Sequence, residues 1–210
     1  MLPDDRELTV YVEEVAVQCN GALFAFSELG SVLKKLDSGL ESQARDICAR
    51  AFFYVHALLA HSGNLSKLLF PSPPRRRKCG LAAPAPGIKR KLGFARERGK
   101  VLRAALSVDG RSPLRSRKLR NHVEHYDERL DELFETGDAV SVADMNITTG
   151  PAILVPGVRF LRNLDVGKMV VSFEGDEVNL RALQKELQRI RTSAEACPSR
   201  KASRCPEGTA

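Results

Sequence analysis

Residues 6–36 read RELTVYVEEVAVQCNGALFAFSELGSVLKKL, and this stretch decides the fold class. Its apolar residues recur at alternating steps of four and three: Leu8, Val12, Val15, Cys19, Ala22, Phe26, Leu29, Leu33 and Leu36. This spacing places them on one face of an α-helix. So long and regular a stripe predicts a second helix packed along its whole length.

Residues 41–69 are predicted to form that second helix. The same period continues through their apolar and small residues: Ala44, Ile47, Ala51, Val55, Leu58, Ser62, Leu65 and Leu69. Gly39 is a natural end for the first helix, and Pro71 disfavours helix in the residue before it. Because the connection is short, the two helices are expected to form an antiparallel hairpin. His61, near the edge of the stripe, is expected to be a hydrogen-bonded packing residue.

The helical period is lost over residues 71–93, which are rich in proline and cations, so this segment is predicted to be a mobile loop. Helical character returns from Phe94 to Leu106. Ser112 and Pro113 are typical of a helix start, and they predict a further helix that runs to about Phe134.

The pattern changes in the last third of the chain. Val158–Leu161 and Met169–Phe173 are predicted to be the strands of a hairpin with a turn at Asp165–Lys168, and Glu174–Glu177 ends the second strand. A final helix is predicted over Asn179–Ala194.

The predicted fold is therefore mainly α, an antiparallel helical bundle of about four main helices with a small C-terminal β-hairpin plus helix. Residues 1–136 are expected to form the bundle, which carries the loop 71–93. Residues 137–194 are expected to pack on it, and residues 195–210 to be a disordered tail.

The composition disfavours several classes of protein. A chain of 210 residues with 43% apolar content can bury a hydrophobic core. No window holds the roughly 18 uncharged apolar residues of a membrane span, and the acidic start Met1–Asp5 is unlike a secretory signal. The five cysteines include no CxxC pair, which argues against a zinc ribbon or a thioredoxin-like site. We expect a reduced, cytoplasmic protein without a cofactor, in which Cys19 and Cys48 are buried thiols.

Positive charge is concentrated in one block. Residues 71–120 contain 16 Lys and Arg against 2 Asp and Glu, a net charge of +14, whereas the rest of the chain has 17 against 24, a net charge of −7. The densest part of the block is Arg75, Arg76, Arg77 and Lys78. A localised block attracts phosphate strongly, although a solvated, flexible loop would have the same composition.

The predicted helix after this block reads LRNHVEHYDERL over residues 119–130. Its apolar stripe is expected to face the core: Leu119, Val123, Tyr126, Leu130 and Leu133. One flank carries two cations and two histidines: Lys118, His122, His125 and Arg129. Such a flank suits an anionic ligand such as phosphate. Two alternatives stay open, namely surface ion pairs with neighbouring carboxylates and a metal site completed by His56 or His61.

Arg120, Asn121 and His125 fit an R-x4-H pattern with a polar residue directly after the arginine. This pattern resembles the motif of HEPN domains, small helical bundles of which many are metal-independent ribonucleases that act as dimers. The resemblance covers the motif with its helix and the all-helical organisation of about residues 6–135. Residues 61–71 and 121–131 also look like those of uncharacterised bacterial proteins of similar length.

Two features depart from the HEPN pattern. Some members have one residue between the histidine and a tyrosine, whereas Tyr126 follows His125 directly. Arg120 and His125 also lie about 140° apart on an ideal helix, so they converge only through long side chains or across a dimer interface.

The resemblance implies an endoribonuclease mechanism. A ribose 2′-hydroxyl would attack the adjacent phosphorus, with His125 as general base or acid, Arg120 stabilising charge on the phosphate oxygens and Asn121 orienting the phosphate or the histidine. The following residues would hold the RNA backbone: Arg75, Arg76, Arg77, Lys78, Lys118, His122 and Arg129. RNA and a second copy of the chain are the implied partners, without metal or membrane, and an antitoxin-like partner stays unidentified. The alternative is a non-catalytic helical protein that binds proteins or nucleic acid.

Overall fold

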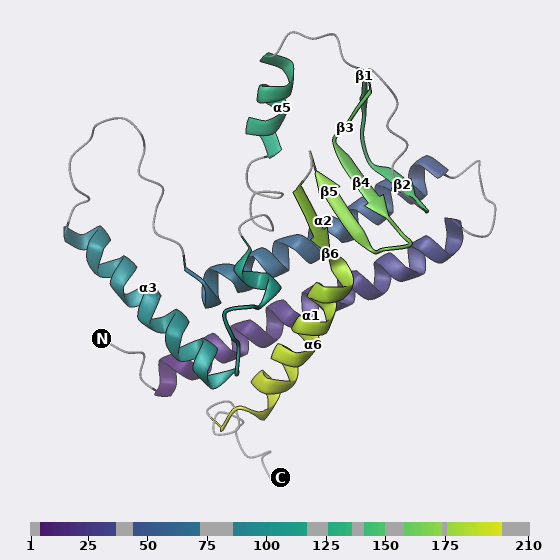
Figure 1. Ribbon diagram of the computed structural model, residues 1–210. Coiled ribbons are helices and arrows are strands. Elements are labelled where there is room, and N and C mark those ends of the chain that lie inside the picture. Colours follow the sequence, from purple (N-terminus) through teal and green to yellow (C-terminus); the bar gives the residue numbers. More distant parts are fainter. Residues whose placement is uncertain are drawn as a thin grey trace, which may run out of the picture.

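Two long helices form the antiparallel hairpin that the apolar stripes predict (Figure 1). The computed structural model describes residues 5–36, 44–71, 86–116, 126–135, 141–149, 158–173 and 176–198. Helix α1 spans Asp5–Leu36 and α2 spans Ala44–Leu69, and their facing sides are buried. On α1 the buried face is wider than the predicted stripe, because it also includes Ala16, Ala25 and Val32.

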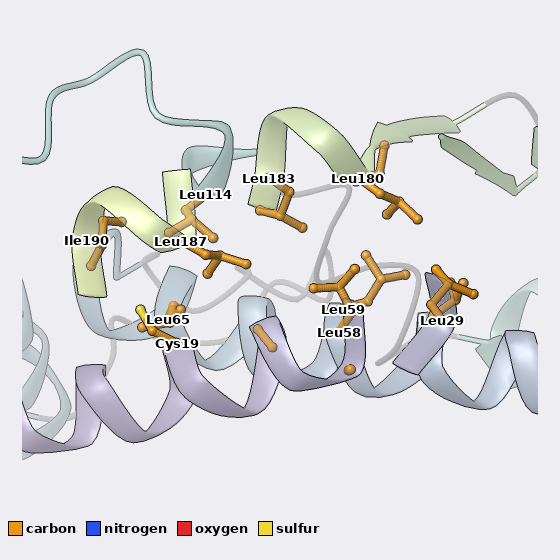
Figure 2. Close-up of a cluster of buried hydrophobic side chains, with 14 of the residues drawn as sticks. Cys19, Leu29, Leu58, Leu59, Leu65, Leu114, Leu180, Leu183, Leu187 and Ile190 are labelled. Carbon is orange, nitrogen blue, oxygen red and sulfur yellow. The ribbon is translucent and has the colours of Figure 1, made fainter. Parts of the chain in front are cut away.

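The wider face of α1 reflects a third helix, α6 (Leu180–Ala196), that packs against α1. Its apolar side is fully buried through Leu180, Leu183, Leu187, Ile190 and Ala194. Figure 2 shows the first four of these side chains, from Leu180 to Ile190, facing Cys19 of α1 and Leu58 and Leu59 of α2 across the core. The Asn179 side chain caps the start of α6, where it accepts a hydrogen bond of 2.8 Å from the backbone N–H of Ala182.

Helix α3 (Pro86–Ala105) packs against α2. It begins before the predicted start at Phe94, so the loop prediction for residues 71–93 is wrong for residues 86–93, where proline occupies the favoured first position of a helix. Residues 72–85 lie outside the described residues. Gly99 permits this packing, because a Cβ there would lie 2.7 Å from Pro71 Cδ and 2.9 Å from the Leu69 carbonyl oxygen.

The helix predicted from Ser112 to Phe134 is not continuous. Pro113–Arg115 form a single 3₁₀ turn, η2, after which the backbone of Ser116 is extended (φ −63°, ψ 130°). Leu114 in this turn is fully buried. Its packing against the bundle, and not the helix propensity of the segment, explains why the helix stops after one turn. Residues 117–125 lie outside the described residues, and α5 covers Tyr126–Glu135. Leu130 of α5 packs against Leu161 and Phe173, as its place in the predicted stripe requires.

Within the described residues, six short strands follow α5. They are β1 (Ser141–Ala143), β2 (Asn146–Thr148), β3 (Val158–Phe160), β4 (Arg162–Asp165), β5 (Val170–Phe173) and β6 (Asp176–Asn179). The order β2-β4-β5-β6 makes one sheet and β1-β3 a second, with β2–β4 and β1–β3 parallel. The inner side chains Leu164, Val171 and Val178 belong to the same hydrophobic core as α1, α2 and α6.

The predicted hairpin exists, but its first strand is β4 (Arg162–Asp165) and not the predicted Val158–Leu161. β4 and β5 pair antiparallel, whereas Val158–Phe160 pairs in parallel with β1. β6 occupies part of the predicted break at Glu174–Glu177, because pairing with β5 supports a strand that has a single buried residue, Val178.

The C-terminal helix is longer than predicted. α6 continues to Ala196 and Cys197 is buried, so a tail that begins at residue 195 starts too early. Residues 199–210 lie outside the described residues. Within the described parts of the chain, no helix is both long and apolar enough to cross a membrane.

Candidate nucleic-acid interface

The predicted catalytic residues Arg120, Asn121 and His125 lie outside the described residues. The same holds for six of the predicted RNA-binding residues: Arg75, Arg76, Arg77, Lys78, Lys118 and His122. Arg129 belongs to α5, but its side chain is not among those described. The described part of the basic block therefore consists of α3 and the segment that follows it to Ser116.

Two arginines of the block hold the end of α2. Arg98 donates a hydrogen bond of 3.0 Å to the carbonyl oxygen of Lys67, and Arg103 donates one to the carbonyl oxygen of Leu69. Their guanidinium groups lie 5.3 Å from the ring centroid of Tyr11 and 5.1 Å from that of Phe70, respectively. The last carbonyls of a helix have no donor within it and carry partial negative charge, so both arginines stabilise the C-terminus of α2.

The two acidic residues of the block are both paired with cations. Lys100 Nζ lies 2.7 Å from Glu97, and this hydrogen bond lowers the pKa of the Glu97 carboxyl. Arg111 binds Asp109 at 3.0 Å, and hydrogen bonds from the backbone and side chain of Arg111 lower the pKa of Asp109. Negative charge in the block is thus locally compensated.

Among the cations of α3 whose side chains the structure describes, Lys91 and Arg96 are exposed and neither cap α2 nor pair with an acid. Arg96 and Lys100 are four residues apart, which places them on the same face of the helix. Arg98 and Arg103 fasten the second half of α3 to α2, so Arg96 and Lys100 project from a part of the helix that is held by hydrogen bonds to its neighbour. Such an arrangement can contact the phosphates of a nucleic-acid backbone.

His61 is a packing residue, as predicted. Its Nδ1 lies 2.8 Å from Gln18 Oε1, which also accepts a hydrogen bond of 3.3 Å from Asn64, and Gln18 donates one to Glu14. The ring lies so close to Gly21 that a Cβ at that position would be 2.6 Å from it. This polar network joins α1 to α2 along one side of the hairpin.

An ion pair between β4 and the turn before β2 was missed by sequence reasoning. Arg162 Nε donates a hydrogen bond of 2.8 Å to Asp144 Oδ1, its Nη2 binds Oδ2, and both side chains are largely buried. Burial is the largest single influence on Asp144 and opposes its ionisation, but the hydrogen bonds from Arg162 and from the Met145 backbone, together with the charge of Arg162, outweigh it and lower the pKa of that carboxyl. Only the parallel pairing of β2 with β4 brings residues 144 and 162 together, and no local sequence pattern signals it.

His56 lies beside this ion pair. It lines a shallow hollow of about 260 Å³, solvent at the mouth included, whose walls are Phe52, Val55, His56, Leu59, Arg162, Val171, Ser172 and Phe173. His56 faces the sheet, whereas His61 faces Gln18 of α1. These two histidines of α2 therefore do not converge on one metal ion. Within the described residues, no group of three or more His, Cys, Asp or Glu could hold a metal ion. The alternative in which His122 and His125 bind metal involves residues outside the described ones.

The environment of His56 predicts a pH-dependent stability. Burial, and then the charge of Arg162, lower its pKa below 6.5, while Asp144 acts in the opposite direction. The unfolded chain thus binds more protons, so the free energy of unfolding is expected to fall as the pH drops below 6.5 and through the lowered pKa. Urea denaturation at a series of pH values measures this loss. In a His56→Gln variant the loss over this range should be smaller, and an unchanged pH profile would contradict the assignment.

Cys19 and Cys48 are poor candidates for a nucleophile at neutral pH. Burial raises the pKa of the Cys19 thiol to about 12, and it also raises the pKa of Cys48. Cys19 is buried, as predicted, whereas Cys48 is only half-buried. A thiol with a raised pKa is protonated and unreactive.

Comparisons of this chain with protein-family models, curated proteins and solved structures found no match. Its function must therefore be inferred from its own residues.

Proposed function

We propose that the protein binds RNA through the basic block of residues 71–120 and cleaves it, without a metal ion, at a HEPN-like centre of Arg120, Asn121 and His125. The observation that carries the proposal is the concentration of 16 Lys and Arg against 2 Asp and Glu in this block. A site that neutralises several phosphates gains affinity from the counterions that it releases, whatever the base sequence.

The described residues support the binding half of this proposal in two respects. Glu97 and Asp109 are each held by a neighbouring cation, so neither leaves an uncompensated negative charge to repel phosphate. Two further arginines, Arg98 and Arg103, anchor the second half of α3 on α2, and Lys91 and Arg96 are exposed on the same helix. A rigid support for the contacting side chains lowers the entropic cost of binding.

The cleavage half rests on the R-x4-H motif. Neutral His125 would accept the proton of a ribose 2′-hydroxyl as that oxygen attacks the adjacent phosphorus. The bond from phosphorus to the 5′-oxygen of the next nucleotide would break, and that oxygen would take a proton from water, which leaves a 2′,3′-cyclic phosphate and a 5′-hydroxyl. Arg120 would stabilise the charge that develops on the phosphate oxygens, and Asn121 would orient the phosphate. Such a reaction needs single-stranded RNA, because the 2′-hydroxyl must line up with the bond that breaks.

RNA binding is tested by fluorescence anisotropy with a single-stranded RNA at several salt concentrations. Changing Arg75, Arg76, Arg77 and Lys78 together to alanine is expected to weaken binding by at least about 10-fold and to lower the salt slope by about 0.7 for each lost contact. A Lys91→Ala, Arg96→Ala variant should show a smaller loss of the same kind.

The matched control removes two exposed cations, Lys34 and Arg45, at the other end of the α1–α2 hairpin from α3 (Figure 1). Affinity for RNA should not change in this control. If all variants bind equally well, or if wild-type affinity does not depend on salt, the basic block is not the RNA-binding surface.

A further inference from the structure

An apolar stripe on the outer side of α1 has no partner within the described residues. Val10, Val17 and Phe24 are 61%, 59% and 65% exposed, although α1 buries its other side against α2 and α6. Single exposed apolar residues are common on monomers, but these three recur every seven residues along one helix. Residues seven apart lie on one side of an α-helix, so the three form a single narrow stripe along which a second helix could lie.

The charges beside this outer stripe restrict its partner. Between Glu7 and Lys34, α1 carries Glu13, Glu14 and Glu28 and no Lys or Arg. Acidic flanks repel phosphate, so the stripe suits neither a nucleic acid nor an anionic membrane surface. A protein partner with a complementary helix remains, and α1 itself meets that requirement.

We propose that α1 pairs with α1 of a second copy of this chain, antiparallel, about a two-fold axis at Val17. In this register Val17 meets Val17 of the second copy, and Val10 meets Phe24 of the second copy on both sides of the axis. Arg6 then lies opposite Glu28 of the second copy, and two-fold symmetry repeats the pair at the other end. The seam from Arg6 to Glu28 would be about 33 Å long.

Charge selects this orientation. Neither Arg6 nor Glu28 has an ion-pair partner within the described residues, and the antiparallel register pairs them with each other. The same register sets Glu14 opposite Asn20 and Glu13 opposite Gly21 of the second copy, so that no like charges face one another. A parallel pair would place every glutamate opposite its own copy, which is repulsive.

The apolar part of this proposal is tested by sedimentation equilibrium on the full chain over a range of concentrations. The wild type is expected to be a dimer, and Phe24→Glu to raise the dimer dissociation constant by about 100-fold, since it places two charges in the seam. Phe134→Glu is the matched control, because Phe134 is 69% exposed but belongs to α5, which lies across α2 from α1 (Figure 1). A monomeric wild type, or equal dissociation constants for the two variants, would overturn the proposal.

The register is tested by charge reversal. Arg6→Glu and Glu28→Arg are each expected to weaken the dimer about 5-fold, and the double variant to restore the wild-type dissociation constant, because the pair is then re-formed with its charges exchanged. If the double variant is no tighter than the single ones, the antiparallel register is wrong. Circular dichroism checks that each variant stays helical. These outcomes do not depend on RNA binding, so the function proposed above can fail while the dimer stands.

Discussion

RNA cleavage is expected to fall by about 10²- to 10⁴-fold when His125 is replaced by alanine, the range that a general acid or base contributes. The expectation follows from the R-x4-H motif, in which an imidazole that titrates near neutrality moves the proton of the 2′-hydroxyl. The substrate for the assay is a single-stranded RNA in EDTA, and the products are resolved on a denaturing gel. EDTA tests at the same time whether the reaction proceeds without a metal ion.

His122→Ala is the control for this assay. His122 is the other histidine of the same predicted helix and lies outside the R-x4-H motif, so its loss should weaken RNA binding but leave the rate at saturating RNA within about 10-fold. The proposed nuclease activity is wrong if the wild type does not cleave RNA, or if it cleaves no faster than His125→Ala. Salt-dependent binding without cleavage would favour the alternative of a non-catalytic nucleic-acid-binding protein.

The free energy of unfolding is expected to fall by about 3 kcal/mol in a Leu187→Ala variant, within the range for a leucine truncated in a close-packed core. Leu187 is fully buried at the middle of α6, where Figure 2 places it above Cys19 of α1 and Leu65 of α2. The truncation removes buried apolar surface and leaves a cavity that the three surrounding helices cannot fill.

Urea denaturation followed by circular dichroism measures this change. Gln188→Ala, at the adjacent exposed position of the same helix, should change the free energy of unfolding by no more than about 0.5 kcal/mol. A loss below about 1 kcal/mol for Leu187→Ala would mean that α6 is not an integral part of the core.

The helices that could be predicted are those whose buried residues recur at a regular spacing along the sequence. In α1 and α2 the apolar residues recur over many turns, so the period itself shows which side faces the core. Local start signals were less reliable. Ser112 and Pro113 do open a helical turn, but it ends at Arg115, where burial of Leu114 and the extended backbone of Ser116 replace a continuing helix.

The short strands were harder to predict for a physical reason. β6 has one buried residue, Val178, and its strand conformation depends on hydrogen bonds to β5, which lies several residues earlier in the chain. The β1–β3 and β2–β4 pairs are parallel, so their partners are separated by 17 residues in each register (158 − 141 and 163 − 146). Pairing at that separation leaves no periodic trace in the sequence.

By itself the sequence determined that the protein is mainly helical, that two long helices form a hairpin, and that positive charge gathers in residues 71–120. Each of these depends on residues that are near one another in the chain. Tertiary structure alone decided that α6 completes the core, that Arg98 and Arg103 cap α2, and that Asp144 binds Arg162. The reason is that these contacts join segments distant in sequence, whose approach depends on how the helices and strands pack.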